Sequence, residues 1–277
     1  MNIKVLGSLD VRENGVSVVP TAPKPRQVLA LLALHADQVV SVAALTEELW
    51  GATPPRSFRT TLQTYVLQLR ELIAAALEAG GPQRDGQGRT AKDVLVTLPG
   101  GYLLAGGDGT SDVREFERLA GVGHRAMDAG DLPGAARQLS RALALWSGPP
   151  FADVQAGEQL QTEAQRLEET RLCALDQRIE ADLRLGRHRD LLAELTVLVN
   201  RYPLHETLRG QYMLALHRSG RRSEALEAYQ RLRAVLVREM GLEPSAELRR
   251  MQRLILRAEP DAVSEQVAGV TGQRRSG

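Results

Sequence analysis

Amide and hydroxyl side chains recur at helical spacing between residues 57 and 77. At 100° per residue, one face of this segment is polar and carries Thr60, Gln63, Thr64, Gln68 and Glu71. The other face carries Leu62, Tyr65, Val66, Leu69 and Ile73, while Leu67 falls on the polar face and interrupts it. Amides and hydroxyls so spaced can bond base edges in the major groove of DNA. Because most helices also turn a polar face to water, the segment by itself leaves both interpretations open.

Two stretches without acidic residues bring basic side chains to the same region. Residues 14–36 contain Lys24 and Arg26, and residues 51–70 contain Arg56, Arg59 and Arg70. The net charge of the 277-residue chain is only +1, and residues 1–110 hold ten basic and ten acidic side chains. The placement of charge, rather than its total, can still create a basic face that attracts phosphates.

These patterns predict a set of DNA contacts. The predicted groove contacts are Arg59, Thr60, Thr61, Gln63, Thr64 and Gln68, and the predicted phosphate contacts are Lys24, Arg26, Arg56 and Arg70. Gly100, in a bare Gly-Gly turn, is predicted to approach the DNA backbone or minor groove. For Arg70, an ion pair with Glu71 or Glu78 is an equally good interpretation.

Side chains suited to catalysis or metal binding lack the arrangement that either needs. The sequence has no Gly-x-Gly-x-x-Gly, phosphate-loop or Gly-x-Ser-x-Gly motif, and its five histidines are scattered. The single cysteine, Cys173, cannot form an internal disulfide and is expected to be a core thiol beside Leu172 and Leu175. No stretch approaches the roughly 18 apolar residues of a membrane span. We therefore expect a cytoplasmic protein that is not an enzyme and needs no cofactor, metal or membrane.

The elements that must position these residues begin with short strands. Residues 3–6, 9–11 and 16–19 read as strands, with an Asn14-Gly15 hairpin turn before the third. Pro23 and Pro25 predict the start of a buried helix ending near residue 35, and Ser41 caps a second helix that ends at Gly51. After the helix at 57–77, residues 94–98 and 102–104 form a hairpin around residues 99–101. This order predicts an α+β winged helix-turn-helix domain.

From residue 112 onward the pattern is helical nearly throughout. Gly130, Gly186 and Gly220 each precede small or apolar residues at helical spacing, and the last two glycines are 34 residues apart, the period of tetratricopeptide helix pairs. A longer helix over about residues 158–185 interrupts the repeat. We therefore predict a winged-helix domain over 1–107, an all-α tetratricopeptide-like bundle over 112–260 and a disordered tail over 261–277.

Several separate motifs resemble one known family. Residues 25–34 (PRQVLALLAL), 39–51 (VVSVAALTEELWG), 54–57 (PPRS) and 60–70 (TTLQTYVLQLR) look like the Streptomyces antibiotic regulatory protein family. The hairpin TLPGGY at 97–102 is similar to that family's wing. The helical half, with GLEPS at 241–245, resembles its bacterial transcriptional activation domain. The resemblance covers roughly residues 1–260.

That resemblance implies a function. It implies an OmpR-type winged helix that binds double-stranded DNA at direct repeats in promoters of antibiotic gene clusters, as a dimer or tandem pair, and recruits RNA polymerase holoenzyme. By the same analogy the helix at 57–77 reads bases and the loop from Trp50 to Phe58 lies where such activators touch polymerase. The chain resembles the family's small class, so no ATP dependence or phosphorylation switch is expected.

Two other functions remain open from sequence. One is a tetratricopeptide adaptor that binds a peptide, which would show no salt-dependent DNA affinity. The other is a ligand-controlled repressor or sensor in which the bundle binds a metabolite, although the pattern of residues 112–258 shows no polar pocket. Activator and repressor are separated here by the resemblance alone.

Overall fold

The computed structural model of the chain describes residues 1–79 and 89–257 and divides it into two compact units. The first unit comprises Met1–Ala120 and Arg141–Leu172, and the second comprises Gly121–Ser140 and the chain from Cys173 onward. The predicted boundary between residues 107 and 112 does not coincide with this division, because part of the helical region folds with the amino-terminal elements. The predicted tail over 261–277 and residues 80–88 lie outside the described residues.

A three-stranded antiparallel sheet opens the first unit. It consists of β1 (Asn2–Lys4), β2 (Asp10–Glu13) and β3 (Val16–Ser17), in that order. Asn14 and Gly15 both have positive φ, 49° and 80°. Such a pair is the two-residue turn whose twist matches that of the flanking strands. The predicted hairpin is therefore confirmed, although β3 ends two residues earlier than expected.

Three helices follow and build the core of the first unit: α1 (Pro23–Leu34), α2 (Val42–Trp50) and α3 (Phe58–Ala79). Proline stands at the start of α1, and the Ser41 hydroxyl caps α2 by accepting the Ala44 N–H at 3.0 Å. Gly51 ends α2 with a φ of 58°. The apolar faces meet at side chains that are almost fully buried, among them Leu29, Leu32, Leu45, Leu62, Leu69 and Ile73. This agrees with the predicted helices.

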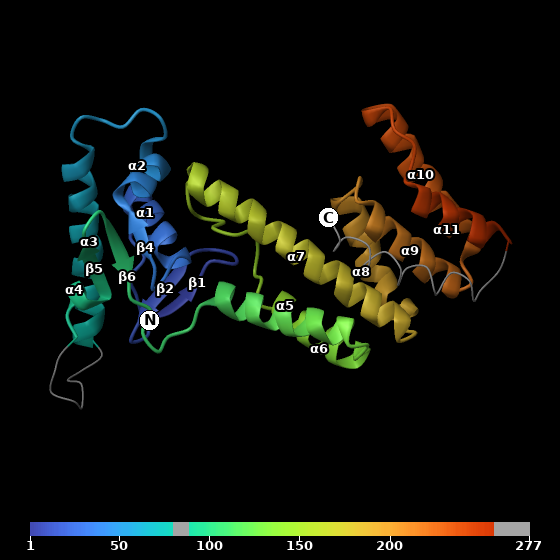
Figure 1. The fold of residues 1–277 in the computed structure, drawn as a ribbon, viewed down its shortest axis with the longest axis horizontal. Coiled ribbons are helices and arrows are strands. Elements are labelled where there is room, and N and C mark those ends of the chain that lie inside the picture. Colours follow the sequence, from blue (N-terminus) through green and yellow to red (C-terminus); the bar gives the residue numbers. More distant parts are fainter. Residues whose placement is uncertain (80–88, 258–277) are drawn as a thin grey trace. The chain divides into compact units, whose positions relative to one another are not determined.

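The wing is a second antiparallel sheet, ordered β4-β6-β5, that lies beside α3 (Figure 1). Its hairpin strands are β5 (Leu95–Leu98) and β6 (Gly101–Leu104), preceded by the short α4 (Ala91–Val94). The third strand, β4 (Val39–Ser41), pairs with β6 and was not predicted, because a strand of three residues is defined only by its partner. A Cβ on Gly101 would lie 2.4 Å from the Val40 carbonyl oxygen, so only glycine permits this pairing.

A buried carboxylate joins α2 to the start of α7 (Glu158–Arg184) within the first unit. Glu48 is 2% exposed and accepts hydrogen bonds from Gly157 N at 2.6 Å and Leu160 N at 3.0 Å. The Gln27 amide donates to the same carboxylate at 2.7 Å. Free N–H groups and the dipole at a helix start favour an anion. Glu48 therefore fixes α7 to the winged helix.

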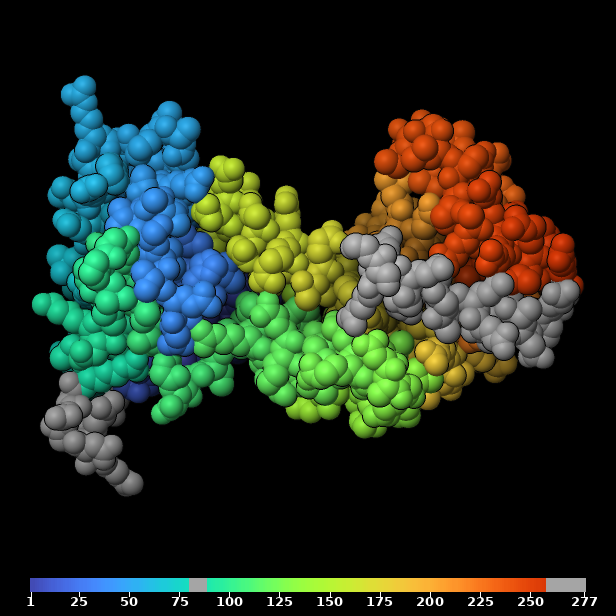
Figure 2. All heavy atoms as spheres, viewed as in Figure 1, coloured from blue at the N-terminus to red at the C-terminus, as the bar shows by residue number. Residues whose placement is uncertain are grey.

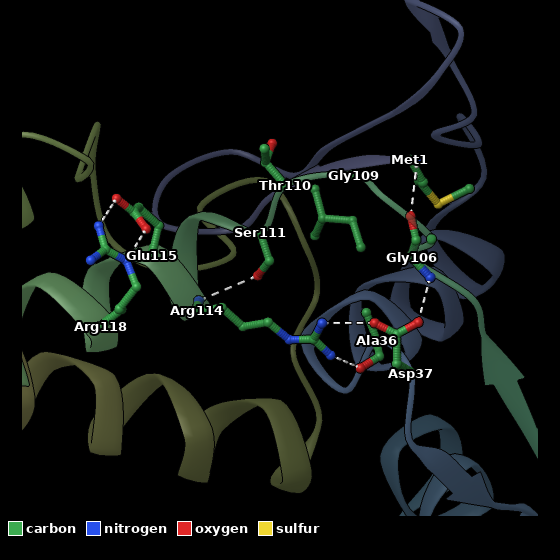
Figure 3. Close-up of a pocket in the computed structure, with 12 residues that line it drawn as sticks. Met1, Ala36, Asp37, Gly106, Gly109, Thr110, Ser111, Arg114, Glu115 and Arg118 are labelled. Atoms are coloured by element: carbon green, nitrogen blue, oxygen red, sulfur yellow. Dashed lines mark hydrogen bonds and ion pairs between the residues drawn. The ribbon is translucent and has the colours of Figure 1, made fainter.

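Two further links hold α5 (Asp112–Asp128) against the amino-terminal residues. The Asp112 carboxylate accepts the N–H groups of Val5 and Leu6 at 2.8 and 2.9 Å. Arg114 reaches the Asp37 carboxylate at 2.7 Å and also donates to the Ala36 carbonyl (Figure 3). Ala36, Asp37 and Arg114 border a cavity of about 300 Å³. Because the charges around it are paired within the unit, we interpret this region as a structural joint.

Both tryptophans of the sequence lie in the first unit. Trp146 is buried, packs edge-on against Phe116 with ring centroids 5.3 Å apart, and lies beneath the Arg171 guanidinium at 4.7 Å. Trp50 is half-buried at the end of α2. Trp146 is therefore a core residue, whereas Trp50 is only partly enclosed.

All regular secondary structure in the described part of the second unit is helical. It contains the end of α5, most of α6 (Leu132–Leu143) and the second part of α7, followed by four more helices among the described residues. They are α8 (His188–Arg201), α9 (Glu206–Arg218), α10 (Arg222–Met240) and α11 (Ala246–Arg257). Gly130, Gly186 and Gly220 have φ of 77°, 81° and 80°, so each follows a helix in the left-handed conformation. The predicted repeat is therefore present.

The prediction that Cys173 is a core thiol is wrong. Its side chain is exposed on α7 rather than part of the core. Residues 172 and 175 are both apolar, but residue 173 is rotated by about 100° from one and 200° from the other, which turns it away from the buried stripe. Partial burial and the neighbouring Asp176 raise the pKa of the thiol. A raised pKa disfavours the reactive thiolate.

Candidate nucleic-acid interface

The polar face of α3 is open to solvent along its first half. Arg59, Thr60, Gln63, Thr64 and Gln68 are all exposed, and Thr61 is half-buried. Leu67, which interrupts this face in the sequence, is 57% exposed. The face therefore combines amides, hydroxyls, one guanidinium and one apolar side chain, the types of group that contact base edges and thymine methyls in a major groove.

The side chains on this face differ in how far the protein itself occupies them. The hydroxyls of Thr61 and Thr64 donate to carbonyls one turn earlier, Ser57 O at 3.1 Å and Thr60 O at 3.0 Å. Each hydroxyl keeps its acceptor lone pairs. The amides of Gln63 and Gln68 have no hydrogen-bond partner among the described residues. The two glutamines are therefore the groups most available to a base.

Basic side chains surround the start of α3. Arg56, in the loop between α2 and α3, and Arg59 are both exposed, and the first turn of the helix has no acidic residue. The Arg59 guanidinium lies 5.7 Å from the centre of the Phe58 ring. Residues 51–57 are all exposed, and in Figure 2 this loop projects from the surface of the first unit. A helix start beside two arginines attracts phosphate.

Lys24 and Arg26 lie at the start of α1 but are occupied within the protein. Lys24 Nζ donates to the Leu49 carbonyl at 2.5 Å and to Gln27 Oε1 at 3.3 Å. Arg26 donates through Nε to Pro20 O at 3.0 Å and pairs with the Asp153 carboxylate at 3.1 Å. Contact with DNA phosphates would require these bonds to be exchanged. We therefore leave both residues out of the interface proposed below.

Arg70 joins α3 to the wing. Its Nε and Nη2 donate to the Leu95 carbonyl at 3.1 and 2.7 Å, and Nη2 also donates to the Thr97 hydroxyl at 2.8 Å. Neither Glu71 nor Glu78 accepts a hydrogen bond or ion pair from Arg70, so the expected ion pair is not formed. Arg70 instead binds strand β5 of the wing. The sequence held no sign of this positioning role, because the main acceptor is a backbone carbonyl 25 residues away.

The tip of the wing offers little side-chain bulk. Pro99 and Gly100 form the turn between β5 and β6, both are exposed, and Gly100 has a φ of 81°. A Cβ built at Gly100 would meet nothing within 4 Å, so the left-handed φ, not crowding, favours glycine there. The turn therefore leaves room for a close approach to a DNA backbone.

Two domain families match the chain. The family described as "Transcriptional regulatory protein, C terminal" matches residues 17–81, and the family described as "Bacterial transcriptional activator domain" matches residues 111–256. The first match contains α1, α2 and α3, and the second contains α5 to α10. None of the described helices is long and apolar enough to cross a membrane. Within the same residues, no three metal-ligating side chains come together.

Similar proteins are transcriptional regulators. The regulatory protein DnrI of Streptomyces peucetius is 53% identical over 262 residues, which cover 94% of this chain and 93% of DnrI. The regulatory protein AfsR of Streptomyces coelicolor is 37% identical, over 92% of this chain but 24% of AfsR. Mycobacterium tuberculosis EmbR, solved in complex with a low affinity phosphopeptide, superimposes with a TM-score of 0.84 at 33% identity, over 98% of this chain and 68% of that one.

The extent of these matches identifies the family. The activator-domain match covers more than half of the chain, and the alignment with DnrI runs nearly the whole length of both proteins. The winged helix and the helical region found in the structure are the two parts that the family combines. The chain belongs to the Streptomyces antibiotic regulatory protein family of DNA-binding transcriptional activators.

Proposed function

We infer that this protein activates a secondary-metabolite gene cluster by binding direct repeats in its promoters. The exposed polar face of α3, beside a wing with a bare tip, is the observation that supports this most strongly. In this proposal Gln63, Gln68, Thr60, Thr61 and Thr64 contact base edges. Arg56 and Arg59 contact phosphates and the groove edge, and Gly100 approaches the backbone. Two molecules bind as a tandem pair or dimer in the bacterial cytoplasm.

Recruitment of RNA polymerase is the second part of the proposal. The loop between α2 and α3 is exposed from Gly51 to Ser57 and adjoins a cavity of about 570 Å³ whose lining includes Thr46, Phe58 and Arg59. A loop fixed between two packed helices presents a defined surface while α3 is occupied by DNA. We propose this loop as a contact for the polymerase holoenzyme.

The test is binding of the purified protein to fragments of its own chromosomal neighbourhood at several salt concentrations. We expect saturable, salt-sensitive binding to a fragment with spaced repeats, and loss of that binding in Arg59→Ala. Arg118→Ala is the matched control, because Arg118 is an exposed arginine on α5 that pairs only with Glu115 among the described residues. Failure to bind any fragment at low salt would overturn the proposal and favour the adaptor function.

A further inference from the structure

A cavity in the second unit is lined by three arginines. It measures about 500 Å³ and lies among α8, α9 and α10, with Arg209, Arg231 and Arg238 in its lining. Thr196, Asn200 and Tyr212 add polar groups, and Val199 and Val235 add apolar wall. No acidic residue belongs to this lining. The residue pattern of 112–258 gives no sign of this cavity, because the lining residues belong to three helices and lie up to 42 positions apart in the chain.

Arg209 is the residue around which the cavity is built. Its side chain is only 8% exposed, and its Nη2 donates to the Val199 carbonyl, near the end of α8, at 3.2 Å. Its Nε is buried and has no acceptor in the described part of the chain. Burial, together with the neighbouring Arg231 cation, lowers the pKa of Arg209. Binding the end of α8 therefore accounts for one of its donors and leaves its charge uncompensated.

The second unit contains another buried arginine, Arg178, whose partners differ from those of Arg209. Arg178, the other buried arginine of the described residues, is 7% exposed and forms ion pairs with Asp182 and Glu194. Among the described residues Arg209 has no such carboxylate, and Arg231, the charged side chain that lowers its pKa, has the same sign. A buried cation without a counter-charge is costly to the fold. A bound anion would supply that counter-charge.

The other lining groups suit an anionic ligand. The Thr196 hydroxyl donates to the Leu192 carbonyl at 2.8 Å and lies 3.4 Å from the Tyr212 hydroxyl oxygen, so the Tyr212 O–H is left to donate toward the cavity. Arg231 is an exposed member of the lining, and Arg238 is paired with Glu239 at 2.9 Å, which leaves its remaining N–H donors available. Donors on a buried arginine and on a rim arginine can converge on one carboxylate or phosphate.

The geometry points to a binding site for a small organic anion, formed by Arg209 and Arg231 between α8, α9 and α10. The expected ligand is a carboxylate or phosphate attached to an apolar group. The cavity has the volume of a small-molecule site, and its lining includes both cationic and apolar side chains. This site is separate from the DNA interface and does not depend on the proposed operator.

Isothermal titration of the full chain with three naphthalene probes tests this site. The probes are 1-naphthoate, 1-naphthyl phosphate and the uncharged 1-naphthamide. The variants are Arg209→Gln and Arg231→Gln, and the control is Arg250→Gln, an exposed arginine on α11 that is not part of the lining. Circular dichroism verifies that each variant is folded. If Arg209→Gln does not fold, Arg231→Gln decides, because Arg231 is exposed.

We expect at least one of the two anions to bind saturably and the amide to bind far more weakly. Each pocket variant should raise the Kd for that anion by about tenfold or more, the value of a charge-assisted contact, while Arg250→Gln leaves it unchanged. The tighter anion identifies the ligand as a carboxylate or a phosphate. Binding of the amide as tightly as the anions, equal binding by wild type and Arg231→Gln, or no binding of either anion at millimolar concentration would overturn the proposal.

Discussion

Gln63 carries a donor and an acceptor on one planar amide, and the structure leaves both exposed on α3. A glutamine amide matches the paired acceptor and donor that adenine presents in the major groove. An arginine on a phosphate acts differently, because it contributes equally to every sequence. The two types of residue should therefore differ in what their removal changes.

Replacing Gln63 by alanine should relax the sequence preference. We expect a loss of roughly 1–3 kcal/mol at the preferred base and little change at other bases. Binding to a set of operators with single base-pair changes measures this, and an unchanged thermal unfolding curve serves as the control. An unchanged base preference in Gln63→Ala would show that this part of α3 does not enter the groove.

Asp176 gives the second unit a pH-dependent stability. Burial raises the pKa of this carboxyl to about 7, and His205 Nε2, 3.6 Å away, is too distant for a strong hydrogen bond. Between the ordinary pKa near 4 and the raised value, the folded state holds a proton that the unfolded state releases. The contribution of Asp176 to stability is therefore present at low pH and lost as the pH rises through about 7.

Substitution of Asp176 by asparagine should remove this dependence. At pH 8 we expect Asp176→Asn to be more stable than the wild type by on the order of 2 kcal/mol, and at pH 5 the difference should shrink. Urea unfolding followed by circular dichroism at the two pH values measures it. Glu169→Gln, which changes an exposed carboxylate on the same helix, is the control. Parallel pH profiles for wild type and Asp176→Asn would contradict this account.

At the scale of elements, the position of the wing relative to α3 depends on Arg70. Its three hydrogen bonds join the middle of the helix to the edge strand β5. Hydrogen bonds from a charged donor are worth about 1.5–3 kcal/mol. The residue therefore affects DNA binding through geometry, whereas Arg56 is exposed and has no hydrogen-bond or ion-pair partner among the described residues.

This contrast predicts opposite signatures for two arginine variants. Arg70→Ala should lower the free energy of unfolding by about 1.5–3 kcal/mol and weaken DNA binding without changing its salt dependence. Arg56→Ala should leave stability unchanged and reduce the slope of log affinity against log salt by about one. Urea unfolding and salt titrations of both variants measure this. A reduced slope in Arg70→Ala would instead identify Arg70 as a phosphate contact.

The elements that the sequence predicted well are those fixed by local chemistry. The Asn14-Gly15 turn, the Ser41 cap and the three glycines that follow helices each depend on the conformation of one or two residues. The apolar face of α3 was predicted because its period is set by the helix itself. The winged-helix class followed from the order of these elements.

The features that escaped prediction depend on partners far away in the chain. Lys24, Arg26 and Arg70 were assigned to DNA as cations, but their acceptors include backbone carbonyls that no residue pattern reveals. Strand β4 exists only through its pairing with β6. The cavity around Arg209 required three helices to be placed together. Charge and periodicity in a sequence predict which face of a helix is polar or basic. They do not show which of those side chains already form hydrogen bonds within the protein.

At the scale of the whole molecule, the proposed tandem binding makes the spacing of DNA repeats decisive. Two molecules on direct repeats can contact each other only if both lie on the same side of the duplex. Successive sites share a side when they are separated by whole turns of about 10–10.5 base pairs. The two compact units of each chain would then be repeated along the promoter in the same orientation.

Insertion of five base pairs between the repeats should weaken binding to the pair by at least about tenfold. Insertion of ten or eleven base pairs should restore much of the affinity, and a fragment with a single repeat gives the reference. Gel-shift titrations of these fragments measure the effect. Equal affinity at all spacings would show that each molecule binds alone.

The placement of the tryptophans confines tryptophan fluorescence to the first unit. Trp50 and Trp146, the only two in the sequence, both belong to the first unit, whereas the described aromatic side chains of the second unit are Tyr202, Tyr212 and Tyr229. Excitation beyond the tyrosine absorption band therefore reports on the DNA-reading half alone, without any attached dye. A fluorescent anion in the second unit would be observed against a background free of indole emission from that unit. DNA binding can therefore be followed by tryptophan emission, and anion binding by the emission of the anion itself.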